Sequence, residues 1–228
     1  MPKLLVENLK PSPEGSASKT ITDLKQGVHN SNRVNVFVDH EFSFSLDLTQ
    51  VVDFHLKIGK ALMPEELAEL KRASAYGKLY GGTLEWVLTR PRSVKETRDH
   101  LIKKRFQKKL DFADADINEI LAKLSQKGYL DDRKFATWFI ENRFVKKGIS
   151  KTRLRQELLI KGIDKNLIDE LLENSSRTET EEIKKVIRKK APKTTDPQKL
   201  LAYLVRHGFP YDLSRELVDA YWASPEDF

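Results

Sequence analysis

The chain has 228 residues, of which 39% are hydrophobic and 33% charged, with a formal net charge of +7 and no cysteine. The lack of cysteine excludes disulfides, Cys-ligated zinc, iron–sulfur clusters and thiol nucleophiles. The N-terminal apolar run is far too short for a signal peptide, and no window approaches a membrane span. We therefore expect a cytoplasmic protein, and its basic balance favours a polyanionic partner.

The N-terminal part of the chain predicts a mobile tail followed by a small β-rich unit. Residues 1–18 concentrate Pro, Gly and Ser, which is typical of a mobile tail. Residues 19–62 alternate apolar and polar side chains and predict a strand and then a hairpin turning at Asp39-His40. In that hairpin Phe37 lies opposite Phe42 and shares a face with Phe44, giving one aromatic face to bury. The following apolar spacing predicts a helix that stops at Gly59.

From Met63 onward the pattern is helical and loosely repetitive. Pro64 is a good first residue for a helix, whereas Gly77, Gly81 and Gly82 predict a break or a weak helix. Three later segments each place an apolar pair before a basic residue, a turn and another apolar residue. The predicted units are residues 63–128, 129–175 and 176–228.

Each such unit holds about three helices and cannot bury its apolar stripes well alone. The predicted fold class is therefore mainly α, with tandem three-helix repeats in an elongated curved array and a small N-terminal β-hairpin/α unit.

Local signals define the expected helix ends. Gly162 and Gly208 sit where a helix C-terminus needs a left-handed residue, and Arg105 fills that place in the first copy. Asp116 with Glu119 is a capping-box pattern. Asp131 or Asp132 is expected to cap the helix that opens the second repeat.

Two basic runs are the candidate binding surfaces. Residues 90–109, which include Lys108 and Lys109, hold nine basic and two acidic residues, and residues 133–165 hold ten and three. A single charge run is usually a solvated helix face, but two runs at equivalent places in two repeats favour contact with nucleic acid or another acidic surface. The candidate contact residues are Arg90, Arg92, Lys95, Arg98, Lys103, Lys104, Arg143, Lys146, Lys147, Lys151, Arg153, Arg155 and Lys161.

Other chemistry-bearing residues have structural explanations. Four aromatic residues could stack bases, but their helical spacing favours a place in the core: Trp86, Phe135, Trp138 and Phe139. Three aspartates, Asp111, Asp114 and Asp116, lack the glycine and terminal glutamate of a calcium loop. The scattered histidines form no helical metal pair, and phosphate-loop, dinucleotide-binding and serine-elbow motifs are missing. We therefore expect no cofactor and no enzymatic activity.

The central segment contains Gly128-Tyr129-Leu130-Asp131-Asp132-Arg133-Lys134-Phe135-Ala136, Gly148, Arg155-Gln156-Glu157-Leu158 and Lys161-Gly162-Ile163. These residues together resemble the central signature of the RecX family, bacterial regulators of the RecA recombinase. The step Arg90-Pro91-Arg92-Ser93 is similar to the family's first repeat, and the unit before Met63 is similar to the N-terminal extension of longer members.

The resemblance implies a non-catalytic protein that binds the groove of the RecA–single-stranded-DNA filament. It implies that the protein blocks filament growth and suppresses ATP hydrolysis and strand exchange, acting in DNA repair. The basic residues named above would then face single-stranded or double-stranded DNA or acidic RecA lobes, and we expect a monomer. The alternatives are a DNA-binding protein that acts without RecA and an enzyme whose active site is split over the repeats.

Overall fold

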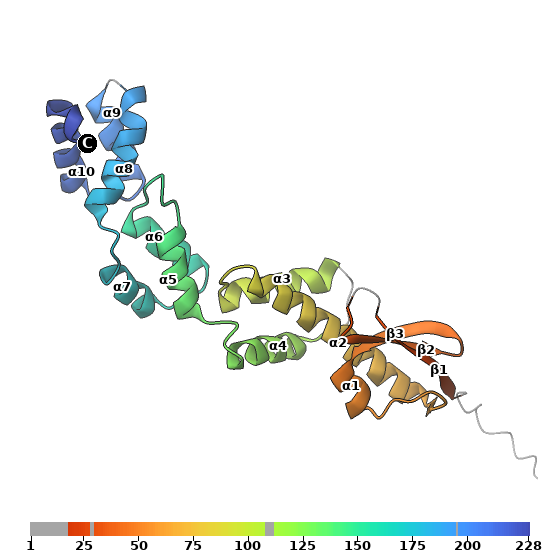
Figure 1. Cartoon of the computed structure of the whole chain (residues 1–228). Coiled ribbons are helices and arrows are strands. Elements are labelled where there is room, and N and C mark those ends of the chain that lie inside the picture. The colour runs from red at the N-terminus through yellow and green to blue at the C-terminus, as the bar shows by residue number, and fades with distance from the viewer. Residues whose placement is uncertain (1–17, 28–29, 108–111, 195) are drawn as a thin grey trace, which may run out of the picture. The chain divides into compact units, whose positions relative to one another are not determined.

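The computed structural model describes residues 18–27, 30–107, 112–194 and 196–228 (Figure 1). The predicted tail lies outside these ranges except for Ser18, as do Lys108, Lys109 and Asp111. The chain divides into two compact units, one ending at Gly82 and one beginning at Thr83. The finer division into three repeats stays a prediction.

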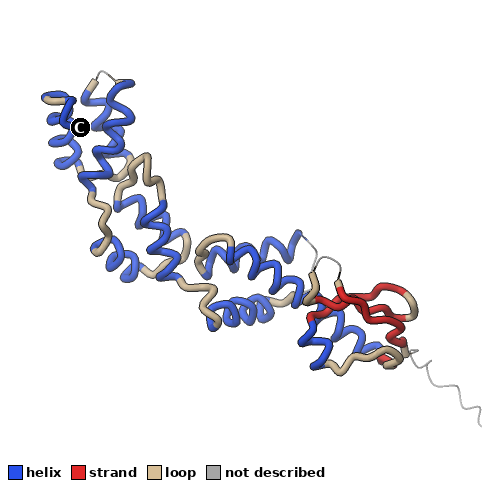
Figure 2. Tube along the Cα trace, viewed as in Figure 1, coloured by secondary structure: helices blue, strands red, loops and turns tan. Residues whose placement is uncertain are grey.

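The N-terminal unit is an antiparallel sheet with helices packed on it (Figure 2). Its strand order is β3-β2-β1-β4. Its buried core joins strand residues such as Ile21, Val36 and Leu46 to Leu70 of the following helix. The elements are β1 Lys19–Gln26, β2 Arg33–Val38, β3 Glu41–Asp47, α1 Leu48–Asp53, β4 Ala61–Leu62 and α2 Pro64–Leu88.

The predicted hairpin is confirmed, but its aromatic face is not. Asp39 and His40 both adopt positive φ, as a two-residue hairpin turn requires, and Phe37 pairs with Phe42. A bulge between Val36 and Phe37 then shifts the register, so that Phe44 pairs with Val36. Because one extra residue reverses the face of every later side chain, Phe44 is buried while Phe42 is 55% exposed.

Two helix predictions in this unit are wrong. The helix α1 ends at Asp53, because the chain turns at His55, which has a φ of 50°, before it reaches Gly59. The helix α2 runs without a break through all three glycines. A side chain at Gly77 would approach the Gln50 amide at 3.3 Å, so the glycine allows close packing there.

The second unit is helical and holds two well-defined cores beyond its first helices. One core centres on Phe135, Leu154 and Ile168, and the next on Ile187, Leu204 and Val218. The helices are α3 Val94–Gln107, α4 Asp114–Gln126, α5 Asp132–Asn142, α6 Lys151–Ile160, α7 Lys165–Glu173, α8 Glu179–Lys190, α9 Pro197–Arg206 and α10 Tyr211–Ala223, with short 3₁₀ turns at Ala191–Lys193 and Pro225–Asp227.

The helix ends test the expected caps. Gly162 and Gly208 have φ of 79° and 84°, as predicted. Asp131 caps α5 by accepting a hydrogen bond from the Lys134 amide at 3.0 Å. The prediction for Arg105 is wrong, because α3 continues to Gln107 and the guanidinium instead donates to Asp114 at 2.6 Å.

The helix start expected at Asp116 is also wrong. Helix α4 begins two residues earlier, at Asp114. Asp116 therefore lies at the third helical position, where its carboxylate accepts a hydrogen bond from the Ala113 amide at 2.8 Å. Asp116 was expected to accept a hydrogen bond as the N-cap of α4. It does accept one, but from the amide of Ala113, which is itself the N-cap.

By their mutual contacts the helices from α3 onward form three groups in the described ranges, α3–α4, α5–α7 and α8–α10. One contact occurs twice between successive groups, and we call it the serine joint. Ser93 Oγ caps α3 and donates to the Lys161 carbonyl at the end of α6 at 2.8 Å. Ser150 Oγ caps α6 and donates to the His207 carbonyl at the end of α9 at 2.7 Å. Each serine thus satisfies a helix start and a helix end at once.

An acidic side chain completes each joint. Asp132 Oδ1 accepts a hydrogen bond from the Val94 amide, and Glu179 Oε1 accepts one from the Lys151 amide, both at 2.9 Å. Burial raises the pKa of both carboxyl groups, although the backbone hydrogen bond opposes it. The two joints use equivalent atoms. The start of α3 therefore packs on the second helix group in the same way as the start of α6 packs on the third.

The glycine that precedes the second joint provides a test of this packing. Gly148 and Gly128 have φ of 75° and 74°, but only at Gly148 would a Cβ collide with the Glu182 carbonyl and with Val186. Gly128→Ala is expected to lower the unfolding free energy by about 1 kcal/mol for the left-handed backbone. Gly148→Ala is expected to cost a further 1–3 kcal/mol or so through overpacking. Urea unfolding of both variants measures the difference, and equal losses would contradict the close packing.

Candidate nucleic-acid and partner interface

The basic residues before and in α3 include a cluster held by one carboxylate. Glu96 Oε1 lies 2.6 Å from Arg90, 3.2 Å from Arg92 and 3.9 Å from Lys161. Burial raises the pKa of Glu96, but the Arg90 hydrogen bond and the three positive charges outweigh it and leave that pKa below its ordinary value. Three of the predicted contact residues are therefore neutralised in part inside the protein.

A second carboxylate does the same between α5 and α6. Glu157 accepts hydrogen bonds from Arg143 at 2.6 Å and from Arg153 at 3.1 Å. Burial raises its pKa, yet these two hydrogen bonds and charges bring the pKa below its ordinary value. Arg155 in turn pairs with Asp169 at 2.7 Å.

The remaining candidate residues divide into one exposed pair and six free cations. Lys95 pairs with Asp99 at 3.3 Å on the surface, a contact of small energetic weight. Six side chains make no ion pair or hydrogen bond with any residue that the structure describes, and we call them the free cations: Arg98, Lys103, Lys104, Lys146, Lys147 and Lys151. Their charge is available to an external polyanion.

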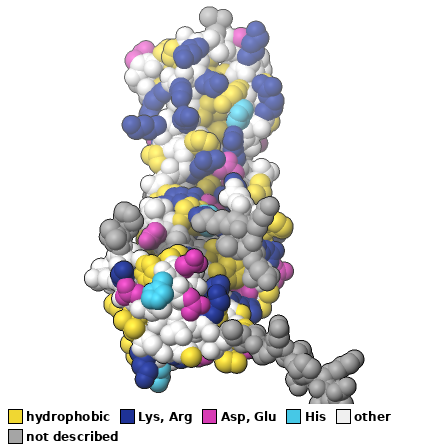
Figure 3. Space-filling view, turned by 90° about the vertical axis from the view of Figure 1, so that its right-hand side faces the viewer, with side chains coloured by type: hydrophobic (Ala, Val, Ile, Leu, Met, Phe, Trp, Pro, Cys, Tyr) yellow, Lys and Arg dark blue, Asp and Glu magenta, His cyan; other side chains and the backbone are white. Residues whose placement is uncertain are grey.

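The free cations lie in two places, one in each of the two basic runs. Arg98, Lys103 and Lys104 are on α3, and Lys146, Lys147 and Lys151 span the turn between α5 and α6. Figure 3 shows further Lys and Arg side chains toward the top of the picture, where α8 to α10 lie, with apolar side chains between them. On α8, Arg188 and Lys189 are exposed, and they were left out of the predicted contact residues.

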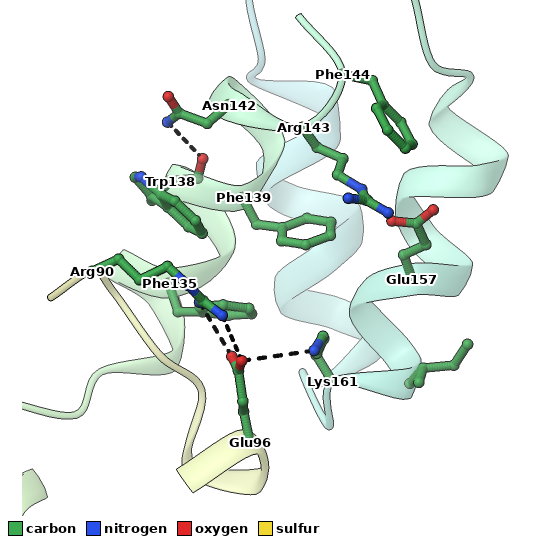
Figure 4. Close-up of a pocket in the computed structure, with 11 residues that line it drawn as sticks. Arg90, Glu96, Phe135, Trp138, Phe139, Asn142, Arg143, Phe144, Glu157 and Lys161 are labelled. Atoms are coloured by element: carbon green, nitrogen blue, oxygen red, sulfur yellow. Dashed lines mark hydrogen bonds and ion pairs between the residues drawn. The ribbon is translucent and has the colours of Figure 1, made fainter. Parts of the chain in front are cut away.

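An aromatic cavity opens between the two carboxylate clusters (Figure 4). It has a volume of about 520 Å³. In the figure Arg90 and Lys161 converge on Glu96 on one side, and Arg143 lies beside Glu157 on the other. Its lining residues are Arg90, Glu96, Phe135, Trp138, Phe139, Asn142, Arg143, Phe144, Glu157, Ile160 and Lys161.

The rings in this cavity are only partly core residues. Phe135 and Phe139 are 1% and 9% exposed and belong to the core, as predicted. Trp138 and Phe144 are half-buried and pack against that core from the cavity side. Trp86 is also half-buried, stacked on His100 with ring centroids 3.9 Å apart and covered by the Arg92 guanidinium.

The turn that carries Arg143 and Phe144 is held from the third helix group. Arg177 donates to the Ile140 and Arg143 carbonyls at 2.6 and 2.7 Å, and its Nη2 donates to Glu182 at 2.6 Å. Glu182 is 2% exposed and also accepts a hydrogen bond from the Ile149 amide. Burial raises the pKa of Glu182, but the hydrogen bonds from Arg177 and Lys185 prevail and lower it.

The described residues include neither a cluster that could bind a metal ion nor a helix that could span a membrane. No group of three or more His, Asp or Glu side chains in the described ranges is placed to hold a metal ion. None of the helices described is long and apolar enough to cross a bilayer.

The sequence analysis did not predict that Glu96 and Glu157 pair with the candidate contact residues. Residue spacing could have revealed two of these ion pairs. Arg153 and Glu157 are four residues apart on α6, and Arg92 and Glu96 have the same spacing across the start of α3; this spacing favours an ion pair. The long-range partners Arg90, Arg143 and Lys161 have no such spacing. The cavity itself depends on how α5 and α6 pack and left no signal in the sequence.

The fold and these surfaces define a helical-repeat protein with a small N-terminal sheet and exposed cationic faces. Residues 19–63 match the family model described as "Regulatory protein RecX N-terminal domain", and residues 131–172 match "RecX, second three-helix domain". The second match covers α5 to α7 almost completely.

Known relatives extend the similarity over most of the chain. The Regulatory protein RecX of Bacillus licheniformis is 35% identical over 200 residues, which cover 85% of this chain and 74% of the relative. That of Bacillus subtilis is 30% identical over 206 residues, covering 87% and 76%. The chain belongs to the RecX family of regulatory proteins.

A solved structure agrees with the fold. A crystal structure of regulatory protein RecX superposes with a TM-score of 0.63 over 89% of this chain and 99% of the other, at 22% identity. The resemblance that the central signature suggested is therefore confirmed, and so is the mainly helical fold class.

The buried Glu182 predicts a pH dependence of stability. Because its pKa is lowered on folding, its contribution is present above the unfolded value of about 4.5 and is lost as pH falls through the folded value. Glu182→Gln leaves Arg177 buried without a counter-ion and is expected to cost about 3 kcal/mol at pH 7. The loss should shrink below pH 4.5. Urea unfolding at several pH values measures it.

The matched control is Glu216→Gln, which removes the same charge from an exposed site on α10. It is expected to change stability little at any pH. If both variants lost the same free energy, or if the loss at Glu182 did not depend on pH, the buried pair would not hold this turn.

Proposed function

We propose that this protein is a non-enzymatic regulator that binds the RecA–single-stranded-DNA filament and limits its growth, ATP hydrolysis and strand exchange. The observation that carries the proposal is its membership of a family of regulatory proteins, supported by 35% identity over 200 residues. In this role it modulates recombination and DNA repair in the cytoplasm, and it acts as a monomer.

The charge arrangement supports a polyanionic target. Six of the candidate contact residues are free cations, so binding to phosphates does not require internal ion pairs to break first. Contacts of this kind release counterions from DNA and make affinity fall steeply with salt. The paired residues, such as Arg90 and Arg143, contribute less to such contacts because Glu96 and Glu157 already hold them.

The helix groups support a mechanism of insertion along a groove. The serine joints hold α3 and α6 in equivalent settings, and basic residues recur at the same positions after each joint serine, Arg98 with Arg155 and Lys104 with Lys161. In the second copy Arg155 pairs with Asp169 and Lys161 lies near Glu96. A periodic target such as a protein filament on DNA presents matching sites at regular intervals. We propose that the cationic sides of the first two helix groups face DNA phosphates or acidic RecA surfaces in the filament groove.

The first experiment is the steady-state ATPase of RecA on single-stranded DNA with increasing amounts of this protein at two salt concentrations. Inhibition at amounts well below that of RecA, weaker at the higher salt, is the expected result. Unchanged ATPase activity, with DNA binding measured separately, would contradict RecA regulation and favour a DNA-binding protein that acts without RecA.

The free cations beside the turn after α5 give a sharper test. Replacing Lys146, Lys147 and Lys151 with Ala is expected to weaken binding to single-stranded DNA. The slope of log affinity against log salt should become shallower by up to about 2, since each single-strand phosphate contact contributes roughly 0.7. Fluorescence anisotropy with a labelled oligonucleotide at four salt concentrations measures both effects.

A control triple variant removes the same charge elsewhere. Lys57, Lys71 and Lys127 are exposed, make no ion pair with the described residues and lie outside both basic runs. Their replacement with Ala should leave the slope nearly unchanged. Equal effects of the two triple variants would mean that only net charge matters and would contradict a defined contact surface.

A further inference from the structure

The aromatic cavity has features that core packing does not explain. Four aromatic rings line a space of about 520 Å³, within the range of roughly 300–1,000 Å³ that ligand pockets occupy. Two of these rings, Trp138 and Phe144, are half-buried rather than enclosed, and Ile160 at the same cavity is 69% exposed. An apolar surface of this kind is accessible to a flat ring from outside.

The backbone at Phe144 is strained in a way that holds its ring at this cavity. Its φ is 48°, a left-handed conformation that is rare for a bulky side chain. Amides of Lys147 and Gly148 donate to its carbonyl at 2.8 and 3.1 Å, and Arg177 fixes the preceding carbonyl. Strain of this kind persists where the surroundings over-determine it, and it is concentrated at ligand-binding sites.

The charges around Phe144 indicate what is attached to such a flat ring. The guanidinium of Arg143 lies 4.0 Å from the Phe144 ring centroid, and Lys147 and Arg153 each lie 5.6 Å from it. Lys146 and Lys147, both free cations, follow directly in the chain. Glu157 already holds Arg143 and Arg153, so the charge left for a ligand at this edge is that of Lys146 and Lys147. Two free cations beside an aromatic cavity suit a flat ring that is linked to phosphate groups.

We propose that the aromatic cavity takes one unstacked base of single-stranded DNA, while Lys146 and Lys147 contact the adjoining phosphates. The inference rests on the proposed function, because it names how the same cationic surface engages its nucleic acid. Base stacking on aromatic side chains tolerates any sequence, so the cavity adds affinity for single strands without selecting a sequence.

The test compares two oligonucleotides of equal length and charge with the full chain. One is a thymidine oligomer, and the other replaces every base by an abasic sugar. Phosphate contacts are the same in both, so a difference in affinity reports base contact alone. The thymidine oligomer is expected to bind about 5- to 150-fold more tightly, the range for stacking of one base.

Adjacent variants assign that difference to the cavity. Ile160→Glu places a charge at the cavity, whereas Leu159→Glu adds the same charge to the neighbouring position, which is 45% exposed and does not line the cavity. Both variants should lose general affinity alike. Only Ile160→Glu is expected to remove the preference for thymidine over abasic DNA. Thermal unfolding checks that both variants fold.

The outcomes separate this inference from the proposed function. Equal binding of the two oligonucleotides by the unchanged protein, with RecA inhibition intact, would overturn the cavity proposal and leave the proposed function standing. A preference that survives in Ile160→Glu would also overturn it, since the base contact would then lie elsewhere. Failure to bind either oligonucleotide would overturn the cavity proposal, whereas the proposed function, which also allows contact with acidic RecA surfaces, is tested separately by the RecA ATPase.

Discussion

The helical unit depends on the hydroxyl group that each of two serines inserts between helix groups. Ser93 and Ser150 are fully buried, and each oxygen accepts a hydrogen bond from its own helix start while donating to the end of a helix in the next group. Removing either hydroxyl would leave an amide and a carbonyl unsatisfied in a dry contact, which is costly. Hydrogen bonds from these serine side chains, and not apolar burial alone, therefore determine how successive helix groups pack on each other.

This arrangement decides which positive charges remain available. The joint at Ser93 brings Lys161 near Glu96, and the packing of α5 on α6 brings Arg143 near Glu157. Cations close to these contacts are neutralised, while Arg98, Lys103 and Lys104 on α3 and the lysines after α5 make no ion pair with the described residues. The surface proposed to contact DNA thus consists of the cations that form no ion pair with the protein's own carboxylates.

Local chemistry made much of the fold predictable. Proline at a helix start, glycine at Gly162 and Gly208, and the Asp131 cap each report a backbone requirement that a single residue reveals. The bulge before Phe44 and the length of α3 beyond Arg105 could not be foreseen, because no glycine or proline marks either position. For the candidate site, the basic runs could be recognised in the sequence. The pairing of these residues with Glu96 and Glu157, and the cavity between the two carboxylates, depend on tertiary packing.

The start of α9 is equivalent to the starts of α3 and α6, yet it differs in kind. Asp196 caps this helix in place of a serine, and its carboxylate accepts from the Gln198 amide. The next residue, Pro197, has no N–H to offer to an acid, although Val94 and Lys151 donate theirs at the equivalent position. A helix end that approached the start of α9 would meet neither a serine hydroxyl that could donate to its carbonyl nor a free backbone amide at the next residue. The contact that joins the starts of α3 and α6 to later helices therefore cannot form at this start.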